Sequence, residues 1–523
     1  MTRQRLPIGI QDFARLRQTD SYYVDKTPLI RDLIERGDHW FLSRPRRFGK
    51  SLLVDTLKAL FAGQEELFRG LDIHDHWDWS VTHPVVRLSF DRKYDGPEDI
   101  ERNLANQLGL IEHAAGLDPP NPAEAPPERL RTLLYHLHRT TGQRVVVLVD
   151  EYDKPILDGL PDLDRARANR EALRSVYSII KGSAAHVRFV FVTGVSMFSK
   201  VSLFSDMNNL KDISLDPRFA TICGYTDADI DTVFAPELAG LDRDEIRSWY
   251  NGYNWRGETR LYNPFDVLLL LDNREFEPYW FETGSPTFLF ETLKARSMSL
   301  RELEGRTIDR SRVAKFDVGD IGAEALLFQT GYLTITEEIR KGHRTLFRLD
   351  SPNQEVKLSL NDHLLAALTP QDRAPLDDGD TLQSRLEAND FAGFAETLKA
   401  YLASIPYAWH NNDLARYEAW SASLLQMCFR AIGVDMRAEE ASSHGSADMV
   451  VETGGQVFVL EFKMAETDAD IETKMAEAFT QMRDRGYANR YRDRDEPIHR
   501  IAVVCGREAR NLLEVRTEQV NSS

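Results

Sequence analysis

Short apolar runs alternate with stretches of helical periodicity through residues 24–217. The runs at 39–43, 85–90, 145–149 and 187–193 have the length and the β-branched or aromatic content of buried strands. Strands that alternate with helices predict a parallel sheet covered by helices. Segment 119–127 is rich in proline and cannot continue a helix, so it is predicted to be a surface loop.

The middle of the chain predicts a smaller set of elements. Segments 226–233 and 243–250 read as helices that could form a lid over the preceding sheet. Further on, 320–329 reads as a helix and 332–337 and 344–349 as strands, which suggests a winged-helix element. Such elements bind DNA in some proteins and are scaffold in others, and scaffold is the favoured interpretation here. Segment 369–380, rich in Pro, Asp and Gly, is predicted to be a linker.

The C-terminal part shows a change of period. Apolar residues recur at helical spacing over 416–432, which predicts an amphipathic helix. Segments 447–451 and 457–463 then read as two strands joined by the turn Glu452-Thr-Gly-Gly455. The two strands should therefore be neighbours in one hairpin.

Length, charge and cysteine content limit the class of protein. At 523 residues the chain exceeds what one hydrophobic core usually organises, so we expect several domains. A formal net charge of −18 excludes a protein that coats nucleic acid through bulk electrostatics, so any such contact must use a local basic patch. Cys223, Cys428 and Cys505 form no C-x-x-C pair and indicate neither a zinc ribbon nor a disulfide framework. No apolar run resembles a signal peptide or membrane span, so we expect a cytoplasmic protein without a membrane partner.

A phosphate-binding loop is the strongest local signal. The segment Phe41-Leu-Ser-Arg-Pro-Arg-Arg-Phe-Gly-Lys-Ser51 runs from an apolar strand through a loop into a helix. Backbone N–H groups of such a loop cradle phosphates, Lys50 would reach the β and γ oxygens, and Ser51 would hold Mg²⁺. The candidate ATP-binding residues of the loop are Arg47, Phe48, Gly49, Lys50 and Ser51. Arg44 stands where the general pattern G-x-x-x-x-G-K-[ST] has its first glycine.

A second motif supports the first. The apolar run 145–149 delivers Asp150 and Glu151 at its C-terminal end, the edge at which α/β sheets hold their ligands. Asp150 is predicted to bind Mg²⁺ through water, and Glu151 to orient or deprotonate the attacking water. Thr193, at the end of another strand, is a candidate sensor of the γ-phosphate, with a plain core strand as the equal alternative.

The chain resembles a named family, the AAA-ATPase-like proteins that join a P-loop domain to a C-terminal PD-(D/E)XK nuclease-superfamily domain. The resemblance covers almost the whole chain, and it implies that Arg44 in place of glycine is normal for the family. It is carried by these motifs: Gly9-Ile-Gln-Asp-Phe13, Tyr23-Val-Asp-Lys26, Arg44-Pro-Arg-Arg-Phe-Gly-Lys-Ser51, Asp150-Glu-Tyr-Asp-Lys-Pro155, Phe204-Ser, Asn208-Asn-Leu-Lys-Asp212, Tyr250-Asn-Gly-Tyr253 and Gln329-Thr-Gly-Tyr332.

The predicted C-terminal hairpin carries two carboxylates and a lysine. Strand alternation places Glu461 and Lys463 on one face, and the hairpin lets Asp448 approach Glu461. In a PD-(D/E)XK site Asp448 and Glu461 would bind Mg²⁺, or Mn²⁺ in its place, and Lys463 would position the water or neutralise the transition state. Ordinary charge alternation on a solvated strand face is the competing interpretation. The apolar run before Glu461, together with the resemblance, favours the nuclease-type site. The resemblance also marks Glu418 as a further metal ligand and Gln481 as a residue near the active centre.

The sequence thus predicts an α/β protein with three parts. Residues 1–220 would form a P-loop NTPase domain with a parallel sheet, 221–380 a helical lid and winged-helix-like region with a linker, and 381–523 an α/β PD-(D/E)XK nuclease-like domain. The first functional hypothesis is an ATPase that controls a Mg²⁺-dependent nuclease, in genome defence or mobile-element biology, with DNA favoured over RNA as partner. The alternative is a STAND-like signalling switch whose nuclease-like domain only binds nucleic acid or protein. A DNA-translocating motor ranks last, and oligomeric state stays open.

Overall fold

The computed structural model describes most of the chain as two compact units. The first holds the described residues up to Glu355, and the second holds those from Val356 onward. The described residues are 3–117, 124–160, 162–197, 209–280, 305–313, 318, 322–360, 375–403, 435–442, 445–484, 496–506 and 511–520.

The first unit is built on a parallel sheet of five strands. Its order is β2-β3-β4-β1-β5, and every pairing in it is parallel. The four predicted strands are confirmed. β1, β3 and β4 are almost completely buried, and strands buried on both faces read as continuous apolar runs. In β2, buried residues alternate with half-buried ones. The fifth was not predicted, since it has two residues and both are exposed. The strands are β1 His39–Ser43, β2 Val85–Ser89, β3 Val145–Asp150, β4 Val187–Gly194 and β5 Lys211–Asp212.

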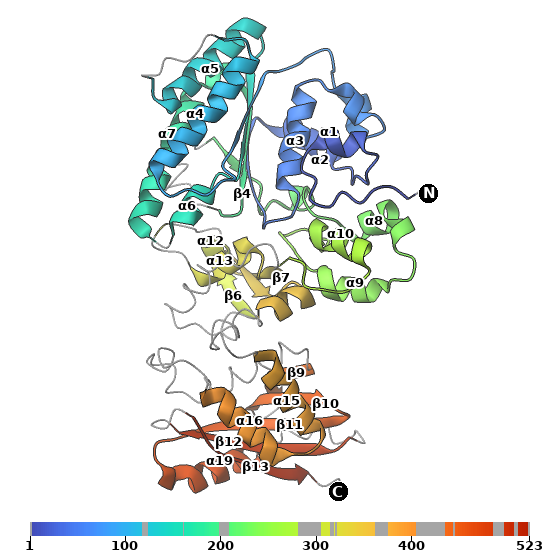
Figure 1. Cartoon of the computed structure of the whole chain (residues 1–523), viewed down its shortest axis with the longest axis vertical. Coiled ribbons are helices and arrows are strands. Elements are labelled where there is room, and N and C mark those ends of the chain that lie inside the picture. The colour runs from blue at the N-terminus through green and yellow to red at the C-terminus, as the bar shows by residue number, and fades with distance from the viewer. Residues whose placement is uncertain are drawn as a thin grey trace. The chain divides into compact units, whose positions relative to one another are not determined.

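Helices cover both faces of this sheet. In Figure 1, α1, α2 and α3 lie on one side of the sheet, and α4, α5 and α7 lie together on the other. The proline-rich loop ends earlier than predicted, because α5 already begins at Pro126, and proline suits the first turn of a helix. The helices are α1 Phe13–Gln18, α2 Thr27–Arg36, α3 Lys50–Phe61, α4 Pro97–Ala114, α5 Pro126–Thr141, α6 Lys154–Gly159 and α7 Leu163–Gly182. Short 3₁₀ helices occur at Glu65–Phe68, Asp72–His76, Ala184–His186, Pro217–Phe219 and Ala235–Glu237.

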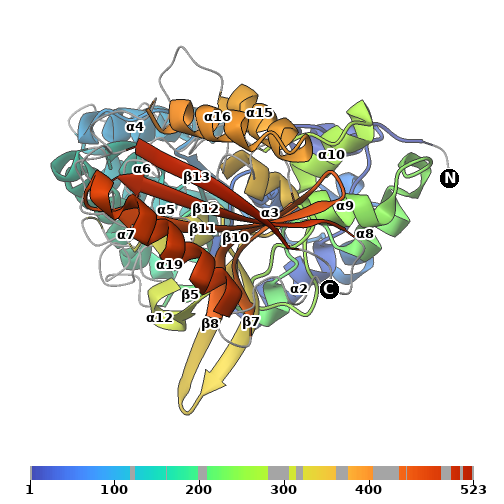
Figure 2. The ribbon, with the colours of Figure 1, turned by 90° about the horizontal axis from the view of Figure 1, so that it is seen from below.

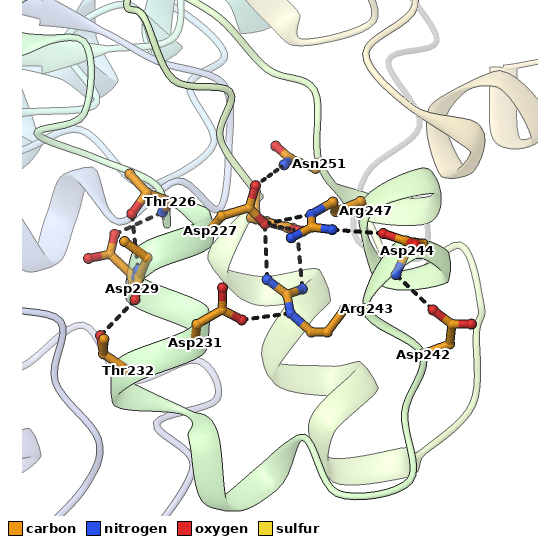
Figure 3. A network of polar contacts seen from close by, with 12 residues as sticks. Thr226, Asp227, Asp229, Asp231, Thr232, Asp242, Arg243, Asp244, Arg247 and Asn251 are labelled. Atoms are coloured by element: carbon orange, nitrogen blue, oxygen red, sulfur yellow. Dashed lines mark hydrogen bonds and ion pairs between the residues drawn. The ribbon is translucent and has the colours of Figure 1, made fainter.

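Three helices form the lid that follows the sheet. The two predicted helices are confirmed as α8 Asp227–Val233 and α9 Arg243–Tyr250, and α10 Pro264–Asn273 joins them. Thr226 caps α8 through a capping box with Asp229. Figure 3 shows how α9 is fixed to α8: Arg243 and Arg247 both bind the carboxylate of Asp227, at 2.9 and 3.1 Å. These ion pairs join α8 to α9.

A small antiparallel sheet completes the first unit. Its order is β6-β8-β7, with strands Arg306–Asp309, Arg344–Asp350 and Thr334–Lys341 respectively. The helices α12 Arg310–Val313 and α13 Ala323–Thr330 accompany it. The predicted helix followed by a hairpin is therefore present as α13, β7 and β8, with both strands about as long as predicted or longer.

The second unit is a mixed sheet between helices. The order is β13-β12-β11-β10-β9, in which only the pair β11–β12 is parallel. Figure 2 shows α15 and α16 on one face of this sheet and α19 on the other. The predicted hairpin is confirmed as β10 and β11. The elements are α15 Pro375–Glu387, α16 Phe391–Ala403, β9 Asp435–Ser442, β10 Gly445–Thr453, β11 Gln456–Ala465, a 3₁₀ helix Asp468–Asp470, α19 Ile471–Asp484, β12 Ile498–Gly506 and β13 Asn511–Val520.

Two expectations for the end of the chain have other outcomes. The prediction of a linker over 369–380 is wrong for residues 375–380, because these residues belong to α15, which begins at Pro375. A proline followed by Asp377 and Asp378 suits the first turn of a helix as well as a loop. The amphipathic helix predicted over 416–432 lies outside the described residues. In the part of the chain that the structure describes, no helix has the length and apolar character needed to cross a membrane.

Candidate nucleotide and nuclease sites

A cavity of about 440 Å³ opens beside the phosphate-binding loop. One wall is formed by residues 46–53, which span the end of the loop and the start of α3. The other walls are formed by the N-terminal residues 9–11, by Glu151 and Asp153 after β3, and by Phe265 of α10. The cavity therefore lies at the C-terminal edge of the sheet and is bordered by the lid.

The loop turns into α3 at a glycine. Gly49 has φ of 87°, in the left-handed region that favours glycine, and the helix begins at the next residue. Lys50 is 7% exposed, and its Nζ donates to the carbonyl of Pro45 at 2.8 Å. Burial lowers the pKa of Lys50, while the nearby carboxylates of Asp150 and Glu151 oppose that shift. The ammonium thus spans the loop at the point where phosphates would bind.

Arg44 stabilises the loop from the protein interior. It is fully buried, and its guanidinium donates to the carbonyls of Ser43 and Ser214 at 2.8 and 2.9 Å and to those of Phe219 and Ala220 at 3.3 Å. Burial lowers the pKa of Arg44 to about 10, so the group stays charged at neutral pH. The guanidinium also lies 4.4 Å from the ring centroid of Trp255. Arg44 thus holds the loop through contacts that a glycine at this position could not make.

Phe48 anchors the other end of the loop to the lid region. Its ring meets those of Tyr253 and Trp255 edge to face, with centroids 4.8 and 5.1 Å apart. Arg47 has φ of 68° and places its guanidinium 4.6 Å from the ring centroid of Phe265. Both side chains therefore hold the loop in place, and the phosphate contacts predicted for these residues would come from their backbone.

The two carboxylates at the end of β3 have different surroundings. Asp150 is buried, with an oxygen 3.7 Å from Arg87, which in turn binds Asp55 of α3 at 2.7 Å. Glu151 lines the cavity and has φ of 52°, a strained conformation for a residue other than glycine. Burial raises the pKa of Glu151 against the opposing effect of Lys50. A carboxylate with a raised pKa in a cavity beside the loop suits proton transfer.

Asp153 is a site residue that the sequence reasoning did not single out. It lines the cavity and accepts hydrogen bonds from the backbone N–H groups of Val195 and Ser196, at 3.1 and 2.6 Å. A Cβ on Gly194 would lie 2.3 Å from the Asp153 carboxylate, so this close approach requires glycine. Asp153 is part of the motif Asp150-Glu-Tyr-Asp-Lys-Pro155, which supported the family resemblance. The motif alone did not indicate what Asp153 contacts.

Thr193 has a different environment from the one expected of a phosphate sensor. It is fully buried, and its hydroxyl donates to the carbonyl of Leu42 at 2.8 Å. The cavity is lined instead by Val195, two residues further on. The hydroxyl of Thr193 therefore joins β4 to β1, and the structure does not bring it into the cavity.

The residues present fit ATP with Mg²⁺. Ser51 lines the cavity at the start of α3. Asp150 is the last residue of β3, which lies next to β4 in the sheet. Mg²⁺ takes oxygen ligands and is usually held by one or two protein groups together with substrate phosphates. Within the described ranges no group of three or more His, Cys, Asp or Glu residues gathers into a self-sufficient metal site. The Ser51 hydroxyl and the Asp150 carboxylate are oxygen donors of the kind that Mg²⁺ takes.

The second unit buries a carboxylate and an ammonium side by side. Glu461 and Lys463 of β11 are 1% and 8% exposed, and their side chains meet at 3.0 Å. They alternate with Leu460, Phe462 and Met464, which pack against α15 and α16, so the pair lies on the face covered by α19. This burial argues against ordinary charge alternation on a solvated strand.

The other predicted nuclease residues are placed only in part. Asp448 belongs to β10 and directly precedes Met449. Met449 pairs with Leu460, the residue before Glu461. The side chain of Asp448 lies outside what the structure describes, and so does all of Glu418. Gln481 lies in α19, on the helix that packs over β11. Glu461 and Lys463 are thus the two members of the predicted set that are seen in contact.

Comparisons with known proteins match both units. A family model described as a predicted AAA-ATPase matches residues 7–204, and one described as the PD-(D/E)XK nuclease superfamily matches residues 416–515. A relative from Azotobacter chroococcum mcd 1, described as an uncharacterized protein in the vnfD 5' region, is 51% identical over 516 residues and is covered to 98%, as is this chain. The crystal structure of Cdc6p from Pyrobaculum aerophilum is 13% identical, with a TM-score of 0.24, over 70% of this chain and 97% of that one.

The family resemblance and the predicted fold class are therefore confirmed. The first unit has the parallel α/β sheet of a P-loop ATPase-like domain, and the second has a mixed sheet with a nuclease-superfamily match. Both matches point to ATPase-like and nuclease-like function. The chain belongs to the family of predicted AAA-ATPases that carry a PD-(D/E)XK nuclease-superfamily domain toward their C-terminus.

Proposed function

We propose that this protein binds and hydrolyses ATP in the first unit and that this controls cleavage of nucleic acid by the second. The observation that carries the first half is the cavity that brings Lys50, Ser51 and Glu151 together at the C-terminal edge of a parallel sheet. The observation that carries the second half is the buried contact between Glu461 and Lys463. DNA is the favoured substrate, and genome defence or mobile-element biology is the favoured setting.

ATP hydrolysis would use each of these groups in a separate role. The N–H groups at the start of α3 and the ammonium of Lys50 would bind the β- and γ-phosphates. Ser51 and Asp150 would hold Mg²⁺, whose charge helps to neutralise the phosphates. Glu151 would orient the attacking water and accept its proton, a role that fits the upward shift of its pKa. Asp153 would position the loop after β4 through Val195 and Ser196.

Phosphodiester cleavage would use the residues of the hairpin. Glu461 and Asp448, with Glu418, would hold one or two divalent cations, which supply charge stabilisation at the scissile phosphate. Lys463 would hold the attacking water or neutralise the phosphate oxygens. Since Lys463 now contacts Glu461, a cation bound to that carboxylate would release the ammonium toward the substrate.

Burial of this pair also favours a second candidate. A carboxylate that is 1% exposed and already neutralised by lysine could be structural, in which case the second unit only binds nucleic acid or protein. The protein would then be a nucleotide-dependent switch. The two candidates differ in one measurable respect, because only the first breaks phosphodiester bonds.

Two assays with matched variants test the proposal. Wild-type protein should bind ATP and release phosphate, Lys50→Ala should lose binding, and Glu151→Gln should bind ATP but hydrolyse it far more slowly. Labelled single- and double-stranded DNA and RNA, with Mg²⁺ or Mn²⁺, should be cut by wild type and left intact by Glu461→Gln. Release of phosphate without cleavage of any substrate would leave the switch as the function, and failure to bind ATP would overturn the proposal.

A further inference from the structure

The cavity contains one cation whose side chain has no partner within the described part of the molecule. Four of its basic residues are already engaged: Lys26 with Asp229 at 2.8 Å, Lys154 with Asp158 at 3.1 Å, Lys50 with the Pro45 carbonyl at 2.8 Å and Arg47 with the ring of Phe265. Arg46 also lines the cavity and is exposed. Its guanidinium is the one left for a ligand.

The backbone on both sides of Arg46 is fixed. Arg44 is held by four carbonyls, as described above, and the carbonyl of Pro45 accepts from Lys50. The ring of Pro45 also packs against Gly331, where an added Cβ would lie 2.9 Å from the proline Cβ. Arg47, on the other side, has a left-handed φ and is anchored on Phe265. The backbone of Arg46 is therefore fixed on both sides, while its side chain is available to bind a group that enters the cavity.

The guanidinium shares the cavity with the carboxylate that would handle the attacking water. Arg46 and Glu151 both line it, and so does Lys50. A group bound in this cavity would therefore lie between these side chains. The terminal phosphate of a nucleotide is the anion that would come between Lys50 and this carboxylate.

We propose that Arg46 is a catalytic residue that binds the γ-phosphate of ATP in the same chain and stabilises the charge that builds on it during hydrolysis. This inference rests on the proposed ATPase function. In the step, water forms a bond to the γ-phosphorus, the bond to the β–γ bridging oxygen breaks, and ADP leaves with that electron pair. The proton of the water passes to Glu151 and then to phosphate, while Arg46 keeps its protons and donates hydrogen bonds throughout.

The geometry favours Arg46 over its neighbours for this role. Arg44 is buried behind the loop, and Arg47 is turned toward α10. An arginine built into the phosphate loop would supply within one chain the charge that other nucleotide hydrolases receive from a second protein. Such a group acts mainly on the transition state, so its loss should lower kcat more than it raises KM.

The experiment compares Arg46→Ala and Arg46→Lys with wild type. We expect Arg46→Ala to lower kcat by on the order of 10²–10³-fold with a much smaller change in KM, and Arg46→Lys to restore part of the loss. Binding of ADP should be unchanged, whereas binding of ADP with aluminium fluoride, which mimics the transition state, should weaken. Arg102→Ala is the matched control, because Arg102 is an exposed arginine of α4 whose partner among the described residues is Asp99 in its own helix.

Each outcome has a distinct meaning. Wild-type kcat in a folded Arg46→Ala protein would overturn the inference and leave the ATPase proposal intact. Activity restored by mixing Arg46→Ala with Lys50→Ala, which keeps Arg46 but should not bind ATP, would also overturn it, because Arg46 would then act on a second copy. If wild type binds no ATP, the proposed function fails first and this inference fails with it.

Discussion

The side chain of Gln329 accepts a hydrogen bond from the backbone N–H of Met197 at 2.7 Å, although 132 residues separate the two in the chain. Met197 follows the segment that Asp153 holds at the cavity, and Gln329 lies in the last turn of α13. The amide of Gln329 also donates to the carbonyl of Val313 at 2.9 Å. One buried side chain therefore joins the end of β4, and with it the nucleotide cavity, to the small antiparallel sheet region.

Loss of this contact should loosen the segment after β4. Replacing Gln329 with alanine leaves the N–H of Met197 and the carbonyl of Val313 buried without a partner, at a cost of about 1–3 kcal/mol for each group. We expect a lower melting temperature and faster hydrogen exchange at the Met197 amide. Thr330→Ser is the control, because the hydroxyl of Thr330 donates to carbonyls of its own helix and to no other group in the described part of the chain. Unchanged exchange in Gln329→Ala would contradict this account of the contact.

Arg44 should be needed for stability more than for its charge. Arg44→Ala removes the donor for four carbonyls in a buried place and should lower the free energy of unfolding by about 2–5 kcal/mol. Arg44→Lys should not restore it, since an ammonium cannot reach both sets of carbonyls in a planar fork. Denaturant titration of both variants measures this. A loss of less than 1 kcal/mol in Arg44→Ala would show that the carbonyls find other partners.

A buried carboxyl pair beside the loop predicts a dependence of stability on pH. Asp266 and Glu355 are fully buried and their carboxyl groups interact with each other, while the backbone N–H of Trp280 donates to Glu355 at 2.8 Å. Burial raises the pKa of both groups, that of Glu355 from 4.5 to about 7, and their mutual repulsion also raises the pKa of Asp266. The charged or titratable groups around them are Arg47, Tyr250 and Tyr253.

The sign follows from proton binding. Between pH 4.5 and about 7 the folded state keeps a proton on Glu355 that the unfolded state has lost, so stability falls as the pH rises through this window. The slope attributable to this group is at most about 1.4 kcal/mol per pH unit. Glu355→Gln should remove that slope while keeping an acceptor for Trp280. Unfolding curves measured across the window check this, and the same slope in the variant would exclude Glu355 as its source.

Variants of the Glu461–Lys463 pair should distinguish a role in stability from a role in cleavage. Lys463→Met should be destabilising by about 3–5 kcal/mol, because it leaves a buried carboxylate without its cation. Adding Glu461→Gln should restore most of that stability, since no uncompensated charge then remains. Cleavage should stay absent in both variants if the pair is catalytic. Cleavage that returns with stability in the double variant would make the pair structural.

Three strands of the first unit were predictable because a strand that is buried on both faces has apolar residues at successive positions. The apolar runs that became β1, β3 and β4 are nearly fully buried, so composition alone revealed them. The position of β5 could not be found in this way, since its two residues, Lys211 and Asp212, are exposed and polar. Periodicity also revealed the lid helices α8 and α9, whose caps Thr226 and Asp242 precede them in sequence.

The phosphate loop was predictable as a motif but not in its surroundings. The partners of Arg44 at Ser214 and Ala220 lie 170 and 176 residues away, and no local pattern connects them. The same holds for Phe48 with Tyr253, and for Asp153, whose role depends on how β3 and β4 end beside each other. Strand alternation did predict that Glu461 and Lys463 share a face, because that follows from spacing alone, but not that the face is covered by a helix.

The control of cleavage by ATP is the central claim, and one measurement tests it most directly. Labelled DNA is incubated with wild type, Lys50→Ala and Lys463→Ala, each with and without ATP, in Mg²⁺. We predict that ATP changes the cleavage rate of wild type, that Lys50→Ala cleaves at one rate whether or not ATP is present, and that Lys463→Ala does not cleave. Equal rates with and without ATP in a wild-type protein that hydrolyses ATP would contradict the account.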